Sequence, residues 1–356
     1  MHNLQAYGWN EERNNEWRQR NEDGATPARV VADFGRTYKV VTPERISANL
    51  SGALAHKLKA VDMPKIGDWV LVEIQGDGTG VIKTVLPRTS EIVRGQVGRR
   101  LDKQVVASNV DIAFIMQPLD HDFSVERLER YVFQLASQNI ETVILLNKAD
   151  VANDAIDKQA QLKSLGVKTI IMSAKQDETV AAVEQLILPG VTAVIMGSSG
   201  AGKSTLTNRL LGSERQATAP IRERDSKGRH TTVHRELFLL PSGGMIIDTP
   251  GIRELQLWGD VDDLDSSFPD IALANSRCRY KNCSHDSEDG CAIKAGLKSG
   301  EIDAKRYKSY LNFKRELESL ESKREFIEER RSQQSHESAK RRHRRAIMNS
   351  KFNDID

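Results

Sequence analysis

Apolar runs and polar turns alternate along the middle of this chain of 356 residues. Short apolar, β-rich runs lie at 110–116, 142–146, 169–172, 192–196 and 245–247. Such runs between turn signals predict buried strands, and the longer segments at 124–138 and 203–211 predict helices. Alternation of strands and helices from 110 to about 255 predicts a mostly parallel sheet covered by helices.

The two ends of the chain carry different patterns. Short β-rich segments at 29–41, 68–74 and 80–85, separated by Gly, Asp and Pro turns, predict a small N-terminal β-barrel. The barrel has few aromatic residues, and each could lie in the core or on the surface: Phe34, Tyr38 and Trp69. The polar extension before the barrel is either flexible or packed on it. Near the C-terminus, apolar residues at helical spacing in 303–331 predict a long helix.

A glycine-rich turn follows the predicted strand 192–196 and matches the phosphate-binding pattern GxxxxGKS. In this strand–turn–helix context, backbone N–H groups wrap a phosphate at the positive end of the helix. Lys203 would reach the β- and γ-phosphate oxygens, and the Ser204 hydroxyl would bind Mg²⁺. The nucleotide contacts predicted here are Gly197, Ser198, Ser199, Gly200, Ala201, Gly202, Lys203, Ser204 and Thr205.

The sequence Asn-Lys-Ala-Asp at 147–150 follows the predicted strand 142–146 and matches the guanine-binding pattern NKxD. Asp150 can accept hydrogen bonds from guanine N1 and N2, which adenine does not offer. The Lys148 stem would lie along the base and ribose. Asn147 is open to two roles, a bond to the base edge or a brace on the P-loop. Ligand contacts at the carboxyl ends of strands are typical of open α/β sheets.

Two more motifs complete a GTP site. The run 169–172 is followed by Ser173, Ala174 and Lys175, similar to the SAK loop whose backbone N–H binds guanine O6. The run 245–247 leads into DTPG, a DxxG motif in which Asp248 would hold a magnesium-bound water and the Gly251 N–H would contact the γ-phosphate. NKxD precedes the P-loop here, the reverse of the order in ordinary small GTPases, which predicts a circularly permuted domain.

All three cysteines of the chain lie in a second cluster, Cys278, Cys283, His285 and Cys291. Three thiolates and one imidazole supply a closed tetrahedral Zn²⁺ site with no open position for catalysis, which predicts one structural zinc ion. The odd cysteine count and the polar N-terminus argue against a secreted disulfide framework.

Taken together, these motifs resemble the RsgA (YjeQ) family of circularly permuted bacterial GTPases over about residues 28–346. The resemblance implies an N-terminal OB-fold barrel, a central P-loop GTPase domain and a mainly helical zinc-binding C-terminal domain. The expected boundaries are 1–27 for the extension, 28–90 for the barrel, 91–109 for a basic linker, 110–260 for the GTPase domain, 261–346 for the zinc domain and 347–356 for a tail.

The resemblance also implies an activity and partners. We expect a monomeric, cytoplasmic GTPase that acts late in maturation of the 30S ribosomal subunit, binds 16S rRNA and is stimulated by the subunit. The alternative is an RNA-binding GTP switch whose hydrolysis is incidental to release. A P-loop kinase that uses ATP conflicts with the guanine-binding motifs.

Catalysis is the least determined feature. Ras-like enzymes place a water-orienting glutamine directly after DxxG, and this chain has Ile252 there. In Gly-Arg-His-Thr-Thr at 228–232, which is similar to the family's switch I, Thr231 or Thr232 would complete the Mg²⁺ shell. His230 would orient the water, or it would only contact RNA or pack in the switch.

Composition adds little, because the net charge is only +2. The chain has no apolar run as long as a membrane span, and no membrane partner is expected. A concentrated basic block is either a solvated tail or an RNA contact, and the family resemblance favours ribosomal RNA. Its fixed positive charges are Lys340, Arg341, Arg342, Arg344 and Arg345.

Overall fold

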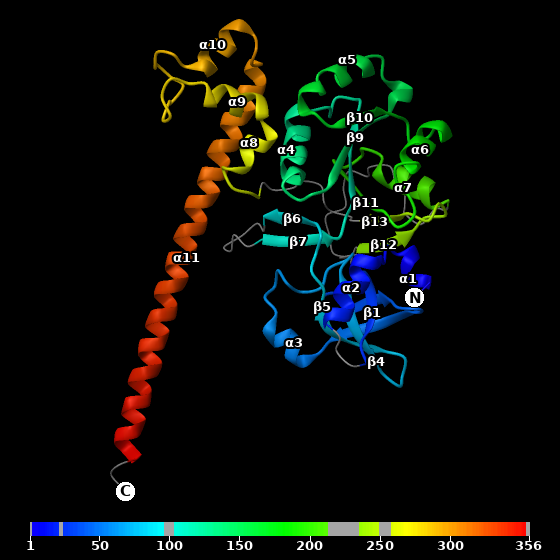
Figure 1. The fold of residues 1–356 in the computed structure, drawn as a ribbon, viewed down its shortest axis with the longest axis vertical. Coiled ribbons are helices and arrows are strands. Elements are labelled where there is room, and N and C mark those ends of the chain that lie inside the picture. The colour runs from blue at the N-terminus through cyan, green and yellow to red at the C-terminus, as the bar shows by residue number, and fades with distance from the viewer. Residues whose placement is uncertain (1, 21–23, 96–102, 213–234, 249–257, 354–356) are drawn as a thin grey trace, which may run out of the picture. The chain divides into compact units, whose positions relative to one another are not determined.

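Eleven strands join into one continuous sheet within the part of the chain that the computed structural model describes, residues 2–20, 24–95, 103–212, 235–248 and 258–353. Contacts divide the chain into two units. The first contains residues 1–94 and 103–257, and the second contains 95–102 and 258–356. The eleven-stranded sheet belongs to the first unit (Figure 1).

One half of this sheet is the predicted parallel sheet. Its order is β10-β9-β8-β11-β13-β12, and every neighbouring pair is parallel except β13 with β12. The bounds are β8 Ile112–Pro118, β9 Glu141–Asn147, β10 Lys168–Ile171, β11 Thr192–Gly197, β12 Arg235–Leu239 and β13 Met245–Asp248. All five strands predicted from apolar runs are confirmed, within two residues at each end.

Helices cover both faces of this half. Successive side chains of β8 point to opposite faces of the sheet, and both sets are buried. Ala113 and Ile115 pack in one core cluster, and Phe114 and Met116 pack in the other. Figure 1 shows α4 and α5 on one side of the sheet and α6 and α7 on the other. Their bounds are α4 Val125–Ala136, α5 Ala155–Ala160, α6 Asp177–Glu184 and α7 Lys203–Leu211, with 3-10 turns at Ala149–Val151 and Lys163–Leu165.

The strand order reverses between β8 and β11. From β8 the chain proceeds outward through β9 to β10, then returns to form β11 on the other side of β8. Ligands of open α/β sheets bind at such a switch point, outside the carboxyl ends of the strands. The loops that follow β8 and β11 therefore meet at the expected position of the site.

The other half of the sheet is a closed five-stranded barrel with the order β1-β2-β3-β5-β4 and a closing pair between β1 and β4. Tyr38 and Trp69 are buried in or against it, whereas Phe34 is 44% exposed. Its elements are β1 Thr26–Asp33, β2 Thr37–Val41, β3 Arg45–Leu50, α3 Gly52–Lys57, β4 Trp69–Ile74 and β5 Gly80–Val85.

The β-rich segment 29–41 supplies two barrel strands and the turn between them. It contains the antiparallel pair β1 and β2, joined by a turn at 34–36. The Asp33 carboxylate accepts the Gly35 N–H, and Gly35 has φ +88°. A glycine adopts this left-handed conformation without the steric cost that a Cβ imposes.

The polar N-terminal extension is packed on the barrel. It forms α1 (His2–Ala6) and α2 (Glu11–Arg20), and the Trp9 ring meets Trp69 edge-on at 4.9 Å. Arg13 donates to the Pro87 carbonyl at 2.7 Å and to Asn109 Oδ1 at 2.8 Å. These bonds anchor α2 to the connection between the two halves of the sheet.

Strand pairing and side-chain hydrogen bonds join the barrel to the parallel half, in addition to the chain connection. Strand β12 pairs with β1 through Ala32–Glu236 and Asp33–Arg235. The fully buried guanidinium of Arg29 donates to the Asn109 carbonyl at 3.0 Å and to Thr192 Oγ1 at 2.9 Å, and burial lowers its pKa to about 10. The segment 91–109, interpreted as a linker, contains the paired strands β6 (Glu91–Gly95) and β7 (Lys103–Ser108).

The second unit is helical in the described residues. Phe268 packs edge-on against Tyr310 and Phe313 of the long helix, and Arg306 forms a bidentate pair with Asp270. These contacts fasten one end of α11 to the smaller helices. The helices are α8 Asp263–Ser267, α9 Pro269–Ser276, α10 Ala292–Ser299 and α11 Ala304–Asn353.

Candidate nucleotide site and cysteine cluster

The P-loop connects β11 to α7 by a turn that only glycine fits at two positions. Gly197 has φ +136°, and a Cβ there would lie 2.1 Å from the Met116 carbonyl oxygen. Gly202 has φ +101°, and its Cβ would lie 2.3 Å from Asn147 Nδ2. The Lys203 ammonium donates to the Gly197 carbonyl at 2.8 Å and to the Ser198 carbonyl at 2.5 Å. The lysine thus lies back over the loop that a phosphate would enter.

Asn147 joins three motifs that are far apart in the sequence. Its side chain is buried, with Nδ2 donating to the Ala201 carbonyl at 2.7 Å and Oδ1 accepting the Ala174 N–H at 2.8 Å. Of the two roles left open by the sequence, the structure shows the brace. Because Asn147 uses both amide atoms in this way, it holds the P-loop and the SAK loop at a set separation.

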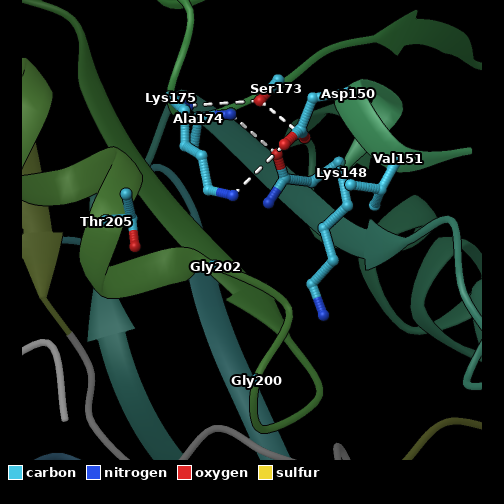
Figure 2. Close-up of a pocket in the computed structure, with 10 residues that line it drawn as sticks. Lys148, Asp150, Val151, Ser173, Ala174, Lys175, Gly200, Gly202 and Thr205 are labelled. Atoms are coloured by element: carbon cyan, nitrogen blue, oxygen red, sulfur yellow. Dashed lines mark hydrogen bonds and ion pairs between the residues drawn. The ribbon is translucent and has the colours of Figure 1, made fainter. Parts of the chain in front are cut away.

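Asp150 lies beside the 173–175 loop in the site. Its Oδ1 accepts the Ser173 hydroxyl at 2.9 Å, and its Oδ2 pairs with Lys175 Nζ at 3.2 Å (Figure 2). The bond from Ser173, followed by the bond from Lys175, lowers the pKa of Asp150. The residue is therefore an ionised acceptor at neutral pH.

A cavity of about 200 Å³ lies between these motifs. Figure 2 shows the 173–175 loop and Asp150 on one side, and the turn of the P-loop at Gly200 and Gly202 on another. The side chain of Lys148 extends away from Asp150. The lining consists of ten residues, nine of them among the sequence-predicted contacts: Asn147, Lys148, Asp150, Val151, Ser173, Ala174, Lys175, Gly200, Gly202 and Thr205.

The sequence reasoning missed the loop at 119–124, which follows β8 and which we call the aspartate loop. Asp120 pairs with Lys148 at 2.8 Å, and the Asp122 carboxylate accepts the Ser198 hydroxyl at 2.6 Å. A signal for it was available, because the loop follows the carboxyl end of a predicted parallel strand, as the recognised motifs do.

Asp248, the first residue of DxxG, ends β13. Burial raises its pKa to about 6, with Lys203 acting in the opposite direction and Glu236 adding to the rise. Burial disfavours the ionised form of this carboxyl group, and a cation bound nearby would stabilise that form. The predicted Gly251, His230, Thr231 and Thr232 lie outside the described residues.

The raised pKa of Asp248 predicts a pH-dependent gain in stability for Asp248→Asn without nucleotide. The folded carboxyl group binds its proton more tightly than the unfolded one, whose pKa is about 3.9. Wild type therefore loses stability relative to the variant as pH rises from about 4 to about 6, and the full loss persists above that range. We expect about 1–2 kcal/mol, reduced for the partial exposure of the group.

The measurement is thermal unfolding of both proteins from pH 5 to pH 8. The advantage of Asp248→Asn should be larger at pH 8 than at pH 5. Asp154→Asn, the same chemical change at the exposed residue before α5, where only a surface ion pair with Lys158 is lost, is the control. An advantage of equal size at both pH values would contradict the assignment.

The four predicted metal ligands lie together in the second unit. Their ligand atoms all fall within 4.8 Å of one another, and His285 Nδ1 lies 3.5 Å from Cys291 Sγ and 3.7 Å from Cys278 Sγ. A tetrahedral zinc site with bonds of about 2.3 Å to sulfur and 2.0–2.1 Å to nitrogen has S···N edges of about 3.6 Å. The donor set therefore fits zinc.

Local structure holds these ligands in place. Cys291 caps α10, where its sulfur accepts the Lys294 N–H at 3.5 Å. The Glu288 carboxylate accepts both the N–H and the hydroxyl of Ser284, and these bonds lower its pKa to about 2. These bonds close a turn between Ser284 and Glu288, in which His285 has φ +64°. The cluster is thus formed by a shaped loop and a helix start.

Comparison with known proteins gives the family. The family model described as RsgA GTPase matches residues 85–258. A small ribosomal subunit biogenesis GTPase RsgA from Opitutus terrae is 40% identical over 304 residues, which cover 82% of this chain and 83% of the relative. The RsgA of Xanthomonas campestris is 38% identical over 339 residues, or 90% of each chain. The chain belongs to the RsgA GTPase family.

Solved structures agree with this membership at the level of the fold. YloQ, described as a circularly permuted GTPase, superposes with a TM-score of 0.61 at 24% identity, covering 83% of this chain and 96% of YloQ. YjeQ from Thermotoga maritima gives 0.63 at 24% identity, covering 82% and 98%. This chain therefore has the circularly permuted GTPase fold, as its motif order predicted.

Two remaining features of this chain are its basic block and the apolarity of its helices. Helix α11 runs through the basic block at 340–345, but the side chains of Lys340, Arg341, Arg342, Arg344 and Arg345 lie outside the described residues. Within the described part of the chain, no helix is both long and apolar enough to cross a membrane.

Proposed function

We propose that this RsgA family member hydrolyses GTP to GDP and phosphate in a cycle coupled to late maturation of the small ribosomal subunit. The observation that carries the proposal is the cavity with an ionised Asp150 at one end and the P-loop at the other, joined by Asn147. The relatives named small ribosomal subunit biogenesis GTPase support the subunit as partner.

Guanine selection would rest on Asp150. Its carboxylate accepts the N1 and N2 hydrogens, whereas adenine offers no matching pair. The Ala174 N–H is engaged by Asn147, so the Lys175 N–H, whose contact with Ser173 Oγ is 3.3 Å, is the better placed donor for O6. This refines the expected role of the SAK loop.

The phosphates would lie in the P-loop. Lys203 exchanges its two carbonyl partners for β- and γ-phosphate oxygens, and the N–H groups at the start of α7 complete the cradle. Mg²⁺, when bound, neutralises charge that develops on the phosphates. The Ser204 hydroxyl is a hard oxygen donor of the kind this ion prefers, and the Asp248 carboxylate would hold a magnesium-bound water. Thr231 or Thr232 would complete the Mg²⁺ shell, and the Gly251 N–H would contact the γ-phosphate.

The attacking water needs a group other than the missing glutamine. Ile252 has no polar atom to orient it, so we assign this role to His230, with contact to RNA as its alternative. Ordering of that segment by the ribosomal subunit would make hydrolysis depend on docking. This arrangement explains how a GTPase with an apolar switch position becomes active on its target.

The other parts of the chain would bind and orient it on the subunit. One structural zinc ion, held by Cys278, Cys283, His285 and Cys291, would stabilise the second unit. The basic block at 340–345 and the barrel would contact 16S rRNA, where fixed positive charge neutralises phosphates. The protein would act as a monomer, in the cytoplasm where the subunit is assembled.

The test is GTP turnover with and without purified 30S subunits. We expect the subunits to increase turnover by at least about tenfold, the effect of completing an electrostatic site. Lys203→Ala should abolish most turnover in both conditions, which controls for contaminating hydrolases. Equal turnover with and without subunits would contradict the coupling and favour a GTP switch whose hydrolysis is incidental.

A further inference from the structure

We propose that the aspartate loop, residues 119–124, positions both halves of the nucleotide site, with Asp122 holding the P-loop and Asp120 holding Lys148. The inference rests on the proposed binding of GTP. It adds Asp120, Asp122 and Arg127 to the residues on which nucleotide affinity depends.

The loop adjoins both motifs. It follows β8, which pairs with β11 on one side and β9 on the other. Strand β11 delivers the P-loop, and β9 delivers NKxD. Because the three strands are parallel and neighbouring, their carboxyl ends bring these loops side by side.

Asp122 is the contact with the phosphate side. Its Oδ2 accepts the Ser198 hydroxyl at 2.6 Å, a bond that spans 76 residues of sequence. Arg127 in the first turn of α4 grips both carboxylate oxygens at 2.8 Å, and buried Gln117 donates to the Asp122 carbonyl at 2.6 Å. The aspartate is therefore held from two directions, and the P-loop is fastened to it.

Arg127 also compensates the negative charge of Asp122. A carboxylate beside a phosphate-binding loop repels the anion that the loop must bind. The bidentate guanidinium offsets this negative charge and keeps the carboxylate ionised as a strong acceptor for Ser198. The pair thus supplies a rigid anchor with little net charge.

Asp120 is the contact with the base side. Its Oδ2 pairs with Lys148 Nζ at 2.8 Å, and its Oδ1 accepts the Asp122 N–H at 2.9 Å. Lys148 has φ +69°, a left-handed conformation uncommon outside glycine, and the ion pair holds its ammonium group. One carboxylate therefore links the base-side lysine to the residue that holds the P-loop.

The consequence is kinetic. A P-loop released from Asp122 samples conformations that do not cradle phosphate, and a bound nucleotide then leaves faster. Lys203, at the other end of the loop, still reaches the phosphates once they are bound. Loss of the anchor should therefore change dissociation and KM more than kcat.

The experiment measures dissociation of fluorescent GDP by stopped flow for Ser198→Ala, Asp122→Asn and the double variant. Each single change should speed dissociation by about tenfold, the effect of losing one hydrogen bond to a charged group. The double variant should be no faster than the faster single variant, because Ser198→Ala removes the bond that Asp122→Asn weakens, and the loss of the Arg127 pair is common to Asp122→Asn and the double variant. Ser198→Thr, which keeps the hydroxyl, should restore slow release.

The controls are Ser137→Ala directly after α4 and Asp154→Asn directly before α5, both exposed and both expected to release GDP at the wild-type rate. Thermal unfolding within a few degrees of wild type shows that Ser198→Ala is folded. Two outcomes would overturn this inference but leave the proposed function standing, provided that the wild type binds GDP. One is an unchanged rate of GDP release from Ser198→Ala, and the other is additive effects in the double variant. A wild type that binds no guanine nucleotide would overturn the proposed function as well.

Discussion

Asp150→Asn should weaken GTP binding by about 10²–10⁴-fold and bind xanthosine triphosphate in its place. The carboxylate is an ionised acceptor held by Ser173 and Lys175, and it would receive two hydrogens from guanine. Loss of hydrogen bonds to a charged group costs about 1.5–3 kcal/mol each. Xanthine has an oxygen at C2, to which the new amide donates.

The measurement is a competition of GTP, xanthosine triphosphate and ATP for wild type and variant against one fluorescent nucleotide. Asp154→Asn, which makes the same chemical change outside the cavity, should keep the preference for GTP. Equal GTP affinity of Asp150→Asn and wild type would remove Asp150 from the base site. If Asp150→Asn binds none of the three nucleotides, the loop is misfolded instead.

Removal of a metal ligand should unfold the second unit and leave the first unit able to bind nucleotide. Protein purified without chelator should hold about one zinc ion, and Cys291→Ser should hold much less. The free energy of zinc binding is folding free energy, about 10–16 kcal/mol in zinc-finger peptides, so its loss exceeds what a small unit can sustain. Cys291 also caps α10, which adds to the effect.

Three measurements check this expectation together: metal content, the helical circular dichroism signal and affinity for fluorescent GDP. His56→Ala removes an exposed histidine of α3 in the first unit, and it should leave all three unchanged. Zinc-free wild type with a folded second unit would refute the structural role. Loss of GDP binding together with zinc would show that the two units do not fold independently.

The sequence by itself determined the parallel sheet, the P-loop and the ligands of the cysteine cluster. In each case the chemistry depends on neighbours in the chain. The P-loop needs glycine at 197 and 202 because a Cβ there would overlap other atoms, so the requirement is written in the motif. Metal ligands within fourteen residues are similarly local. The reversed order of motifs was likewise enough to predict the permuted fold that YloQ shares.

Patterns of apolar residues located strands but not their turns. The segment 29–41 is apolar and β-rich through most of its length, and the break at 34–36 depends on Asp33 closing a turn over Gly35. A charged residue and a glycine inside a strand pattern are weak evidence until the partner strand is known. The packed extension was undetermined for the same reason, since Trp9 has its partner at Trp69.

Only the tertiary structure decided which polar residues serve the nucleotide site. Asp122 meets Ser198 across 76 residues, and Asn147 joins loops that are 54 and 27 residues away. A polar loop residue has many possible partners in a chain, and sequence separation does not rank them. Parallel strands bring their carboxyl ends together at the switch point, and that arrangement selects the few contacts that form.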